Sequence, residues 1–230
     1  MIEKPLGIIP ARGGSKRFPG KNIAELNGKP LLGYAIESAV DSGVFSDVIV
    51  TSDDGDILDV ARSYDSVEAV KRPEEFATDT AQYKDACLYH LEDFRTRGRD
   101  YKTFGVVLVT NPLRRAEHIR EAYEVFENRD GVAVMSLVPR SHPPQRALSI
   151  ENNFVKPFFG EEFMKRTQEL EPTYKHDGSI LFMETEVFLE KEKLFVEQVE
   201  PYFMPEEESV DIDEPIHLEW AEFLLNKRDN

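Results

Sequence analysis

Cysteine, positive charge and long apolar runs are scarce in this chain. The 230 residues include one cysteine, which excludes an internal disulfide. The 28 Lys and Arg are outnumbered by 44 Asp and Glu, and the net charge of −16 disfavours binding to nucleic acid or to anionic membranes. No apolar run approaches the roughly 20 residues of a membrane-spanning helix, and the N-terminus lacks a signal-peptide pattern. We therefore expect a cytoplasmic protein that binds neither nucleic acid nor membrane.

The composition fits one globular core. Hydrophobic residues make up 40% of the chain, aromatic residues make up 10%, and the length suits a single domain over 1–230. The lone cysteine, Cys87, shares a helical spacing with Leu88, Leu91 and Phe94, so we interpret it as a core residue. None of the five histidines has metal-ligand spacing with another, and we interpret all five as structural or solvated.

Apolar periodicity alternates between strand and helix along most of the chain. It predicts strands over 6–10, 48–51, 67–70, 104–109, 132–137 and 179–183. It predicts helices over 31–42, 53–64 with Asp53 as the cap, 79–97, 116–128 and, as a closing amphipathic helix, 216–226. Such a succession indicates an α/β fold with a mostly parallel central sheet.

The pattern is interrupted at about 139–175. Prolines forbid regular helix there, and Asn152-Asn153 sits at the centre of a possible hairpin over 147–155. We expect a small inserted arm that leaves the main sheet. Its aromatic residues fit either a buried interface with another subunit or a loop folded onto its own domain; they are Phe154, Phe158, Phe159 and Phe163.

Residues 8–22 form an apolar strand that runs into a glycine-rich, cationic loop. The first 30 residues hold six Lys or Arg and two Glu, against the strongly acidic balance of the whole chain. Glycines allow backbone N–H groups to approach an anion, while Arg12, Lys16 and Lys21 are spaced to surround a polyphosphate. The spacing matches neither Gly-x4-Gly-Lys-Ser/Thr nor Gly-x-Gly-x-x-Gly. A surface loop with solvated charges is the alternative interpretation.

A pair of carboxylates near the C-terminus is the second chemical feature. Asp211 and Asp213 alternate on a segment that we expect to be extended, so both can face one divalent cation. Mg²⁺ is commonly held by one or two carboxylates together with substrate phosphates. Alternatively, Asp213 only caps the following helix, with Pro215 in its first turn.

Several motifs, in order, resemble the acylneuraminate cytidylyltransferases, also called CMP-sialic acid synthetases, and their legionaminic and pseudaminic acid relatives. These are 10–16 (PARGGSK), 19–22 (PGKN), 27–32 (NGKPLL), 52–54, 72–73, 78–81, 111–114 (NPLR), 177–178 and 211–213 (DID). The resemblance implies a three-layer Rossmann-like nucleotidyltransferase fold. It also implies transfer of CMP from CTP to an acidic nine-carbon α-keto sugar, Mg²⁺ as cofactor, and a homodimer formed through the arm.

The resemblance also implies roles for particular positions. Arg12, Lys16 and Lys21 would be catalytic; nucleotide binding would involve Ala11, Arg12, Gly13, Gly14, Ser15, Lys16, Lys21, Asn22, Arg72, Thr80 and Ala81; the sugar would contact Lys175 and Asp177; the metal ligands would be Asp211 and Asp213. The chain departs from the family pattern at Leu108, where many members have glutamine, at 175–178, and at Tyr83 near the expected base site. Two alternatives stay open: a related enzyme with a sugar phosphate or phosphonate acceptor, and a CTP-binding module without turnover.

Overall fold

A computed structural model describes residues 1–78, 81–128 and 130–228. The strands are β1 Leu6–Pro10, β2 Glu25–Leu26, β3 Lys29–Pro30, β4 Asp47–Ser52, β5 Glu68–Lys71, β6 Thr103–Val107, β7 Ala133–Pro139, β8 Leu148–Glu151, β9 Phe154–Pro157, β10 Tyr174–Glu184 and β11 Val199–Phe203. The α-helices are α1 Leu31–Ser42, α2 Gly55–Arg62, α3 Tyr83–Thr96, α4 Ala116–Glu127, α5 Thr185–Lys191 and α6 Pro215–Arg228. None of these helices has the length and apolar composition needed to cross a bilayer.

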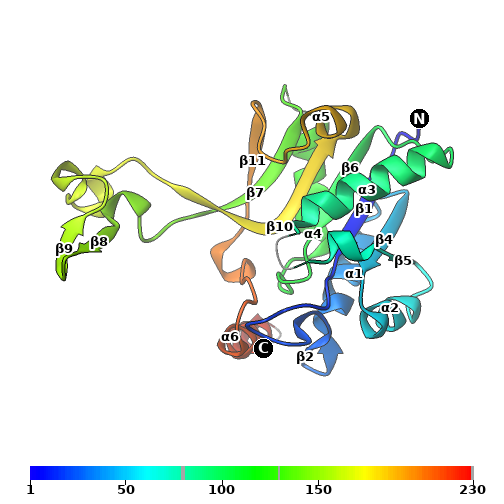
Figure 1. Cartoon of the computed structure of the whole chain (residues 1–230), viewed down its shortest axis with the longest axis horizontal. Coiled ribbons are helices and arrows are strands. Elements are labelled where there is room, and N and C mark those ends of the chain that lie inside the picture. The colour runs from blue at the N-terminus through cyan, green and yellow to red at the C-terminus, as the bar shows by residue number, and fades with distance from the viewer. Residues whose placement is uncertain (79–80, 129, 229–230) are drawn as a thin grey trace.

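Seven strands of the described residues form the central sheet in the order β11-β7-β10-β6-β1-β4-β5 (Figure 1). Strand β1 runs parallel to β4 and β6, and β10 runs antiparallel to both of its neighbours. Strands β4 and β5 lie on one side of β1, and the next strand along the chain, β6, lies on its other side. In open α/β sheets, ligands bind beyond the carboxyl ends of strands at such a change of direction. The expected α/β fold with a mostly parallel sheet is confirmed.

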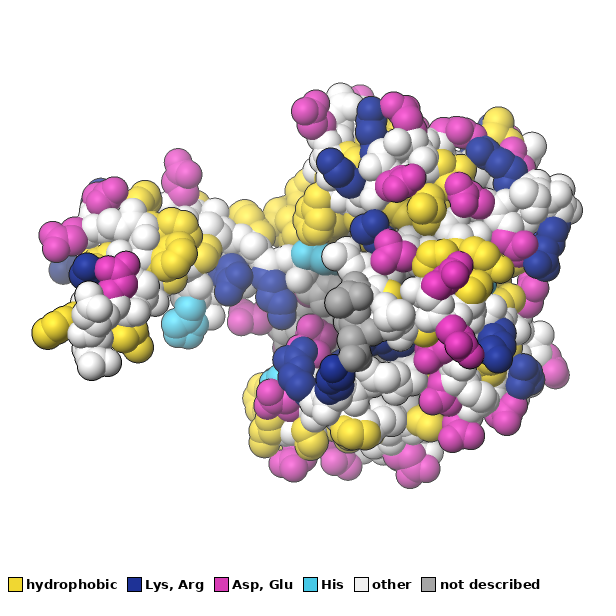
Figure 2. Space-filling view, in the orientation of Figure 1, with side chains coloured by type: hydrophobic (Ala, Val, Ile, Leu, Met, Phe, Trp, Pro, Cys, Tyr) yellow, Lys and Arg dark blue, Asp and Glu magenta, His cyan; other side chains and the backbone are white. Residues whose placement is uncertain are grey.

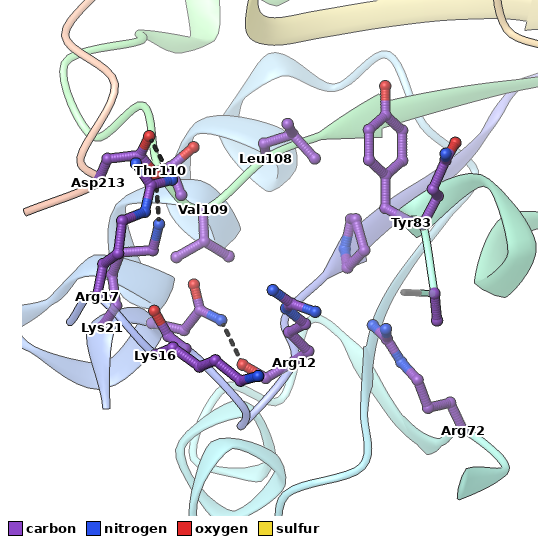
Figure 3. Close-up of a pocket in the computed structure, with 15 residues that line it drawn as sticks. Arg12, Lys16, Arg17, Lys21, Arg72, Tyr83, Leu108, Val109, Thr110 and Asp213 are labelled. Atoms are coloured by element: carbon purple, nitrogen blue, oxygen red, sulfur yellow. Dashed lines mark hydrogen bonds and ion pairs between the residues drawn. The ribbon is translucent and has the colours of Figure 1, made fainter. Parts of the chain in front are cut away.

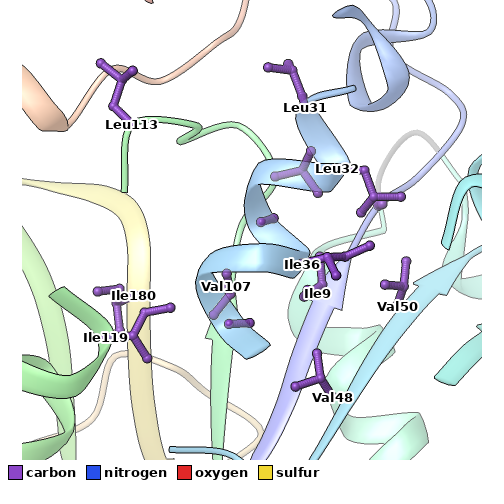
Figure 4. Close-up of a cluster of buried hydrophobic side chains, with 14 of the residues drawn as sticks. Ile9, Leu31, Leu32, Ile36, Val48, Val50, Val107, Leu113, Ile119 and Ile180 are labelled. Atoms are coloured by element: carbon purple, nitrogen blue, oxygen red, sulfur yellow. The ribbon is translucent and has the colours of Figure 1, made fainter. Parts of the chain in front are cut away.

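Each central strand contributes side chains to both faces of the sheet. Ile9 and Val107 pack with α1, α2 and α4, whereas Ile8 and Val106 pack with α3 and α5. This alternation follows from the two-residue repeat of a strand and gives three layers. Figure 4 shows the first cluster, in which Ile36 of α1 lies over Ile9. Cys87 is fully buried in the second cluster, so its interpretation as a core residue is confirmed.

Several predicted boundaries are corrected. Helix α2 is capped by Asp54, whose carboxylate accepts hydrogen bonds from the N–H groups of Asp56 and Ile57, and not by Asp53. Helix α3 begins only at Tyr83, and β6 ends at Val107. The first two residues of the predicted 79–97 helix lie outside the described residues.

The closing helix, α6, is not simply amphipathic. Ala221 and Leu225 are buried against the first core cluster, as the expected apolar face requires. Ile216, Trp220 and Phe223 are nevertheless 52–58% exposed, and the last two rings stack with centroids 5.3 Å apart. The helix therefore carries apolar side chains on its outer side as well, which corrects the prediction.

Residues between β7 and β10 project from the main body as an arm (Figure 1). The predicted hairpin is confirmed: β8 and β9 pair antiparallel around Asn152 and Asn153, which both have positive φ. Asparagine tolerates this left-handed backbone better than most residues. Figure 2 shows apolar side chains on the arm surface, and Phe154 is 71% exposed. The arm is thus a separate projection with an unusual share of exposed apolar area.

Candidate active site

A pocket of about 600 Å³ lies beyond the carboxyl ends of β1 and β6. Its cationic wall comes from the loop after β1, and the segment after β6 forms the opposite wall. Figure 3 shows Arg12 on the cationic wall, with Arg72 to one side and Asp213 to the other. The lining residues are Pro10, Arg12, Ser15, Lys16, Arg17, Lys21, Asn22, Arg72, Ala81, Gln82, Tyr83, Leu108, Val109, Thr110 and Asp213.

The loop after β1 is held by side-chain contacts on both of its flanks. Asn22 is buried and donates its amide N–H to the Arg12 carbonyl at 2.8 Å. The Gly13 N–H donates to Asp53 at 3.1 Å, and an added Cβ at Gly13 would lie 2.4 Å from the Asp54 carboxylate. Gly13 is therefore required for close packing against the β4–α2 connection. The Gly13 N–H already donates to Asp53, so it is not available to a phosphate as we predicted.

Opposite ends of the chain meet at one edge of the pocket. The Asp213 carboxylate accepts hydrogen bonds from Lys21 at 3.1 Å and from Arg17 at 2.9 Å. Burial alone would raise the pKa of Asp213, but the hydrogen bond and charge of Lys21, together with Arg17, outweigh burial and lower that pKa. Asp213 therefore stays ionised and neutralises part of the cationic wall.

Arg72 supplies the cation at the other side. It is 3% exposed, and one guanidinium nitrogen donates to the Thr51 carbonyl at 2.6 Å. Burial lowers the pKa of Arg72, and the charge of Asp53 opposes this change. The Arg72 Nε is buried and has no hydrogen-bond partner among the residues that the structure describes. An unsatisfied buried donor is costly and favours a ligand that accepts from it.

His90 lies directly behind this part of the pocket. Its Nε2 is 2.6 Å from the Thr51 hydroxyl, and burial, followed by the charge of Arg72, lowers the pKa of His90 to about 4. A neutral histidine packs beside Arg72 without adding charge. The interpretation of His90 as structural is confirmed by these contacts.

The remaining predicted site residues are divided between the pocket and its surroundings. Ser15, Ala81 and the three predicted catalytic cations line the pocket, whereas Ala11, Gly13 and Gly14 lie outside its lining. Thr80 lies outside the described residues. Arg17 was missed, although it stands in the same cationic run. Tyr83 and Leu108, noted only as departures from the family pattern, form an apolar part of the wall.

The predicted sugar contacts do not line this pocket. Lys175 is exposed near the start of β10, where the arm returns to the sheet. Asp177 is 2% exposed and accepts hydrogen bonds from Ser136, Ser179 and Ser209. Substrate contact at Asp177 would require one of these partners to leave. The structure therefore places Asp177 beneath the site and not at its surface.

Asp213, in the acidic segment before α6, is the one carboxylate among the described residues that line the pocket. Of the two predicted metal ligands, Asp213 lines the pocket, whereas Asp211, half-buried two residues earlier, is not part of the lining. Within the described residues, no group of three His, Cys, Asp or Glu side chains is arranged to hold a metal. Two carboxylates are compatible with Mg²⁺, which usually obtains its other ligands from water and substrate phosphates. The donor chemistry of this segment thus fits Mg²⁺, provided that Asp213 exchanges its contacts with Lys21 and Arg17.

Comparisons with known proteins show the family to which the chain is related. A family model described as Cytidylyltransferase matches residues 6–226. The chain is 33% identical to the pseudaminic acid cytidylyltransferase of Campylobacter jejuni subsp. jejuni serotype O:23/36 (strain 81-176), over 96% of both chains. It is 34% identical to the CMP-N,N'-diacetyllegionaminic acid synthase of Legionella pneumophila subsp. pneumophila, over 94% of this chain and 93% of that protein.

A solved structure shares the fold. It is a CMP:2-keto-3-deoxy-manno-octonic acid synthetase complexed with CTP, with a TM-score of 0.71 over 98% of this chain and 99% of that chain at 16% identity. The resemblance indicated by the sequence motifs is therefore confirmed at the level of fold and family. The chain belongs to the cytidylyltransferase family.

Proposed function

We propose that the protein transfers the cytidylyl group of CTP to an acidic nine-carbon α-keto sugar, releasing pyrophosphate. The observation that carries the proposal is the gathering of Arg12, Lys16, Arg17 and Lys21 in one pocket at the carboxyl edge of the sheet. Near a protein surface, one cation about 4 Å from a phosphate charge contributes roughly 4 kcal/mol, so several cations suit a triphosphate. Family membership supplies the nucleotide class.

The pocket walls suggest how the substrates lie. The triphosphate runs along Arg12, Lys16 and Lys21, and the base lies toward Arg72 and Ala81. The anomeric hydroxyl oxygen forms a bond to the α-phosphorus and gives up its proton to water, and the bond from that phosphorus to the pyrophosphate oxygen breaks. Such transfer requires positioning and charge stabilisation rather than a covalent intermediate. The side chains nearest the phosphates would therefore be the catalytic ones.

Mg²⁺ is part of the proposal, with Asp211 and Asp213 as its protein ligands. When bound, the ion would neutralise phosphate charge and orient the phosphates. Lys21 now contacts Asp213 at 3.1 Å, and it would be available to the leaving pyrophosphate if that carboxylate held the metal instead. Family resemblance and donor type support this role.

The acceptor is assigned to the part of the wall formed by Leu108. Figure 3 shows Leu108 across the pocket from Arg12. An apolar side chain there offers no hydrogen bond to a sugar hydroxyl, and a site without such a bond favours acceptors with fewer hydroxyl groups at that place. Exposed Lys175 stays the candidate cation for the sugar carboxylate, although lysine lacks the fork geometry of arginine.

Pyrophosphate release tests the reaction. We expect release from CTP and Mg²⁺ with at least one of sialic, legionaminic and pseudaminic acids, and little release with ATP, GTP or UTP. Mass spectrometry would identify the CMP-sugar. Release only with a sugar phosphate or phosphonate would favour the related enzyme, and tight CTP binding without release with any acceptor would favour the binding module.

We further propose that the arm forms a homodimer interface. Its hairpin exposes Leu148, Ile150, Phe154 and Val155 at 54–75% of their surface. Monomeric proteins rarely expose a contiguous apolar patch of this kind, and a stable interface buries about 800 Å² on each partner. Since CTP is a cytoplasmic metabolite, the proposed reaction also assigns the protein to the cytoplasm.

Replacing Phe154 by aspartate is expected to shift the protein from dimer to monomer at micromolar concentration, because the charge would be buried in the interface. Analytical ultracentrifugation measures the change. Phe223→Asp places the same charge on the exposed side of α6, outside the arm, and should leave a dimer. A monomeric wild-type protein, or a Phe154→Asp dimer of unchanged affinity, would contradict the assignment.

A further inference from the structure

We propose that Asp177 is a positioning residue that holds the segment carrying Asp211 and Asp213 in place and does not itself contact the sugar. This inference rests on the proposed function, because it assumes that those two carboxylates serve the phosphate site. The hydrogen bonds made by the buried Asp177 carboxylate support this role.

The Asp177 carboxylate uses both of its oxygens within the protein. Oδ1 lies 2.5 Å from the Ser136 hydroxyl and 3.0 Å from the Ser179 N–H, and Oδ2 accepts from the Ser209 hydroxyl at 2.7 Å. The Asp177 carbonyl accepts a further hydrogen bond from Asn111 at 3.0 Å. Hydrogen bonds to an ionised acceptor are stronger than those between neutral groups. Asp177 thus joins β7, β10 and the segment after β6 to Ser209.

Ser209 stands at the start of the acidic segment. Farther along, the Ile212 N–H donates to the Thr110 carbonyl at 2.8 Å, and the Ile212 side chain is fully buried. The Asp213 N–H lies 3.1 Å from His217 Nδ1. The Ser209–Asp177 bond fixes the near end of this segment, while Ile212 and His217 fix the far end. Asp211 lies between Ser209 and Ile212 in sequence, and Asp213 follows Ile212. The positions of both carboxylates therefore depend on these contacts.

A buried cation, Arg114, contacts the same residue as the Asp177 carboxylate, namely Ser179. Arg114 is 3% exposed and donates to the carbonyls of Leu108 and Ser179, each at 3.0 Å. Burial lowers the pKa of Arg114 to about 9, and the charge of Asp177 opposes that shift. A neutral residue in place of Asp177 would leave this charge without the nearby anion. The same carboxylate therefore balances Arg114 and bonds to Ser209.

Ser209→Ala tests the role, because it removes the hydroxyl and leaves the Asp177 carboxylate and Arg114 unchanged. CTP binding would be measured by calorimetry without acceptor, once with Mg²⁺ and once with EDTA. We expect the gain in affinity that Mg²⁺ gives to fall about tenfold in the variant, with binding in EDTA unchanged. Ser209→Thr keeps the hydroxyl and should restore the gain. Ser63→Ala removes a hydroxyl at the end of α2 and should behave as wild type.

The outcomes separate this inference from the proposed function. If Mg²⁺ strengthens CTP binding equally in the wild type and in Ser209→Ala, the positioning role is overturned while the proposed reaction stands. An equal loss with Mg²⁺ and with EDTA would also overturn it, because the contact would then serve nucleotide binding in general. If Mg²⁺ does not strengthen CTP binding in the wild type, the metal role in the proposed function fails. Thermal unfolding checks that Ser209→Ala is folded. Asp177→Asn is not used as the test, because a change at this buried carboxylate can unfold the protein.

Discussion

Replacing Lys21 by methionine is expected to lower kcat for pyrophosphate release by about 10²–10³, the usual effect of removing one group that stabilises transition-state charge. The Lys21 side chain is only 13% exposed, and its Nζ sits at the pocket edge against Asp213. Methionine fills similar space without a charge, so the fold should persist. Steady-state kinetics with saturating CTP, Mg²⁺ and the preferred acceptor would measure the change.

Lys29→Met is the matched control for this experiment. The Lys29 ammonium pairs with Glu37 at 2.5 Å and does not line the pocket. Its loss should leave kcat close to that of the wild type. A Lys21→Met enzyme with a near-normal rate and an unchanged melting temperature would show that Lys21 has no part in the chemical step.

Replacing Asp213 by asparagine should move two measurements in opposite directions. In EDTA, CTP should bind about three- to tenfold more tightly, because Lys21 and Arg17 lose the anion that competes with phosphate. With Mg²⁺ and acceptor, kcat should fall about a hundredfold, because the cation loses a ligand. Calorimetry and kinetics on the same preparation would provide both values.

Asp59→Asn provides a comparison at a site far from the pocket. Asp59 forms an exposed ion pair with Arg62 on α2, so its replacement should change neither quantity. Weaker CTP binding by Asp213→Asn in EDTA would mean that the carboxylate organises the cationic wall instead of competing with the nucleotide. An unchanged kcat would remove Asp213 from the metal site.

Much of the fold could be predicted because local pattern and tertiary structure agree. The apolar strand of β1 is buried on both faces, as its continuous hydrophobic run indicates. Helix α1 ends at Ser42 and is followed by Gly43, whose φ of 66° suits a glycine after the last turn. The Asn152-Asn153 turn sits where the paired strands require positive φ. In each case a few neighbouring residues determine the conformation.

The errors arose where neighbouring residues have equal local chemistry. Asp53 and Asp54 are both good helix caps, and the choice is made by Gly13, whose N–H engages Asp53 from 40 residues away. The first turn of α3 is set by the reciprocal bonds of Gln82 and Asp85, an uncommon pair for a capping box. Local propensity alone predicts neither the cap of α2 nor the first residue of α3.

The cations of the site could be predicted from sequence, but the contacts between distant parts of the chain could not. Arg12, Lys16 and Lys21 stand in one short loop, so their common location follows from sequence. The bond from Arg17 to Asp213 spans 196 positions. Asp177 and Arg114 are charged residues without an apolar pattern around them, and burial of such groups depends on distant partners. Sequence therefore gave no sign that Asp177 lies beneath the pocket.

The two charged edges of the pocket, represented by Lys21 and Asp213, lie 192 positions apart in the chain. During translation the cationic loop is therefore made long before its anionic partner. Under the proposed function, a nascent chain that has not reached Asp213 carries the cations without the carboxylates of the proposed metal site. A fragment that ends before that residue would then bind anions without turnover.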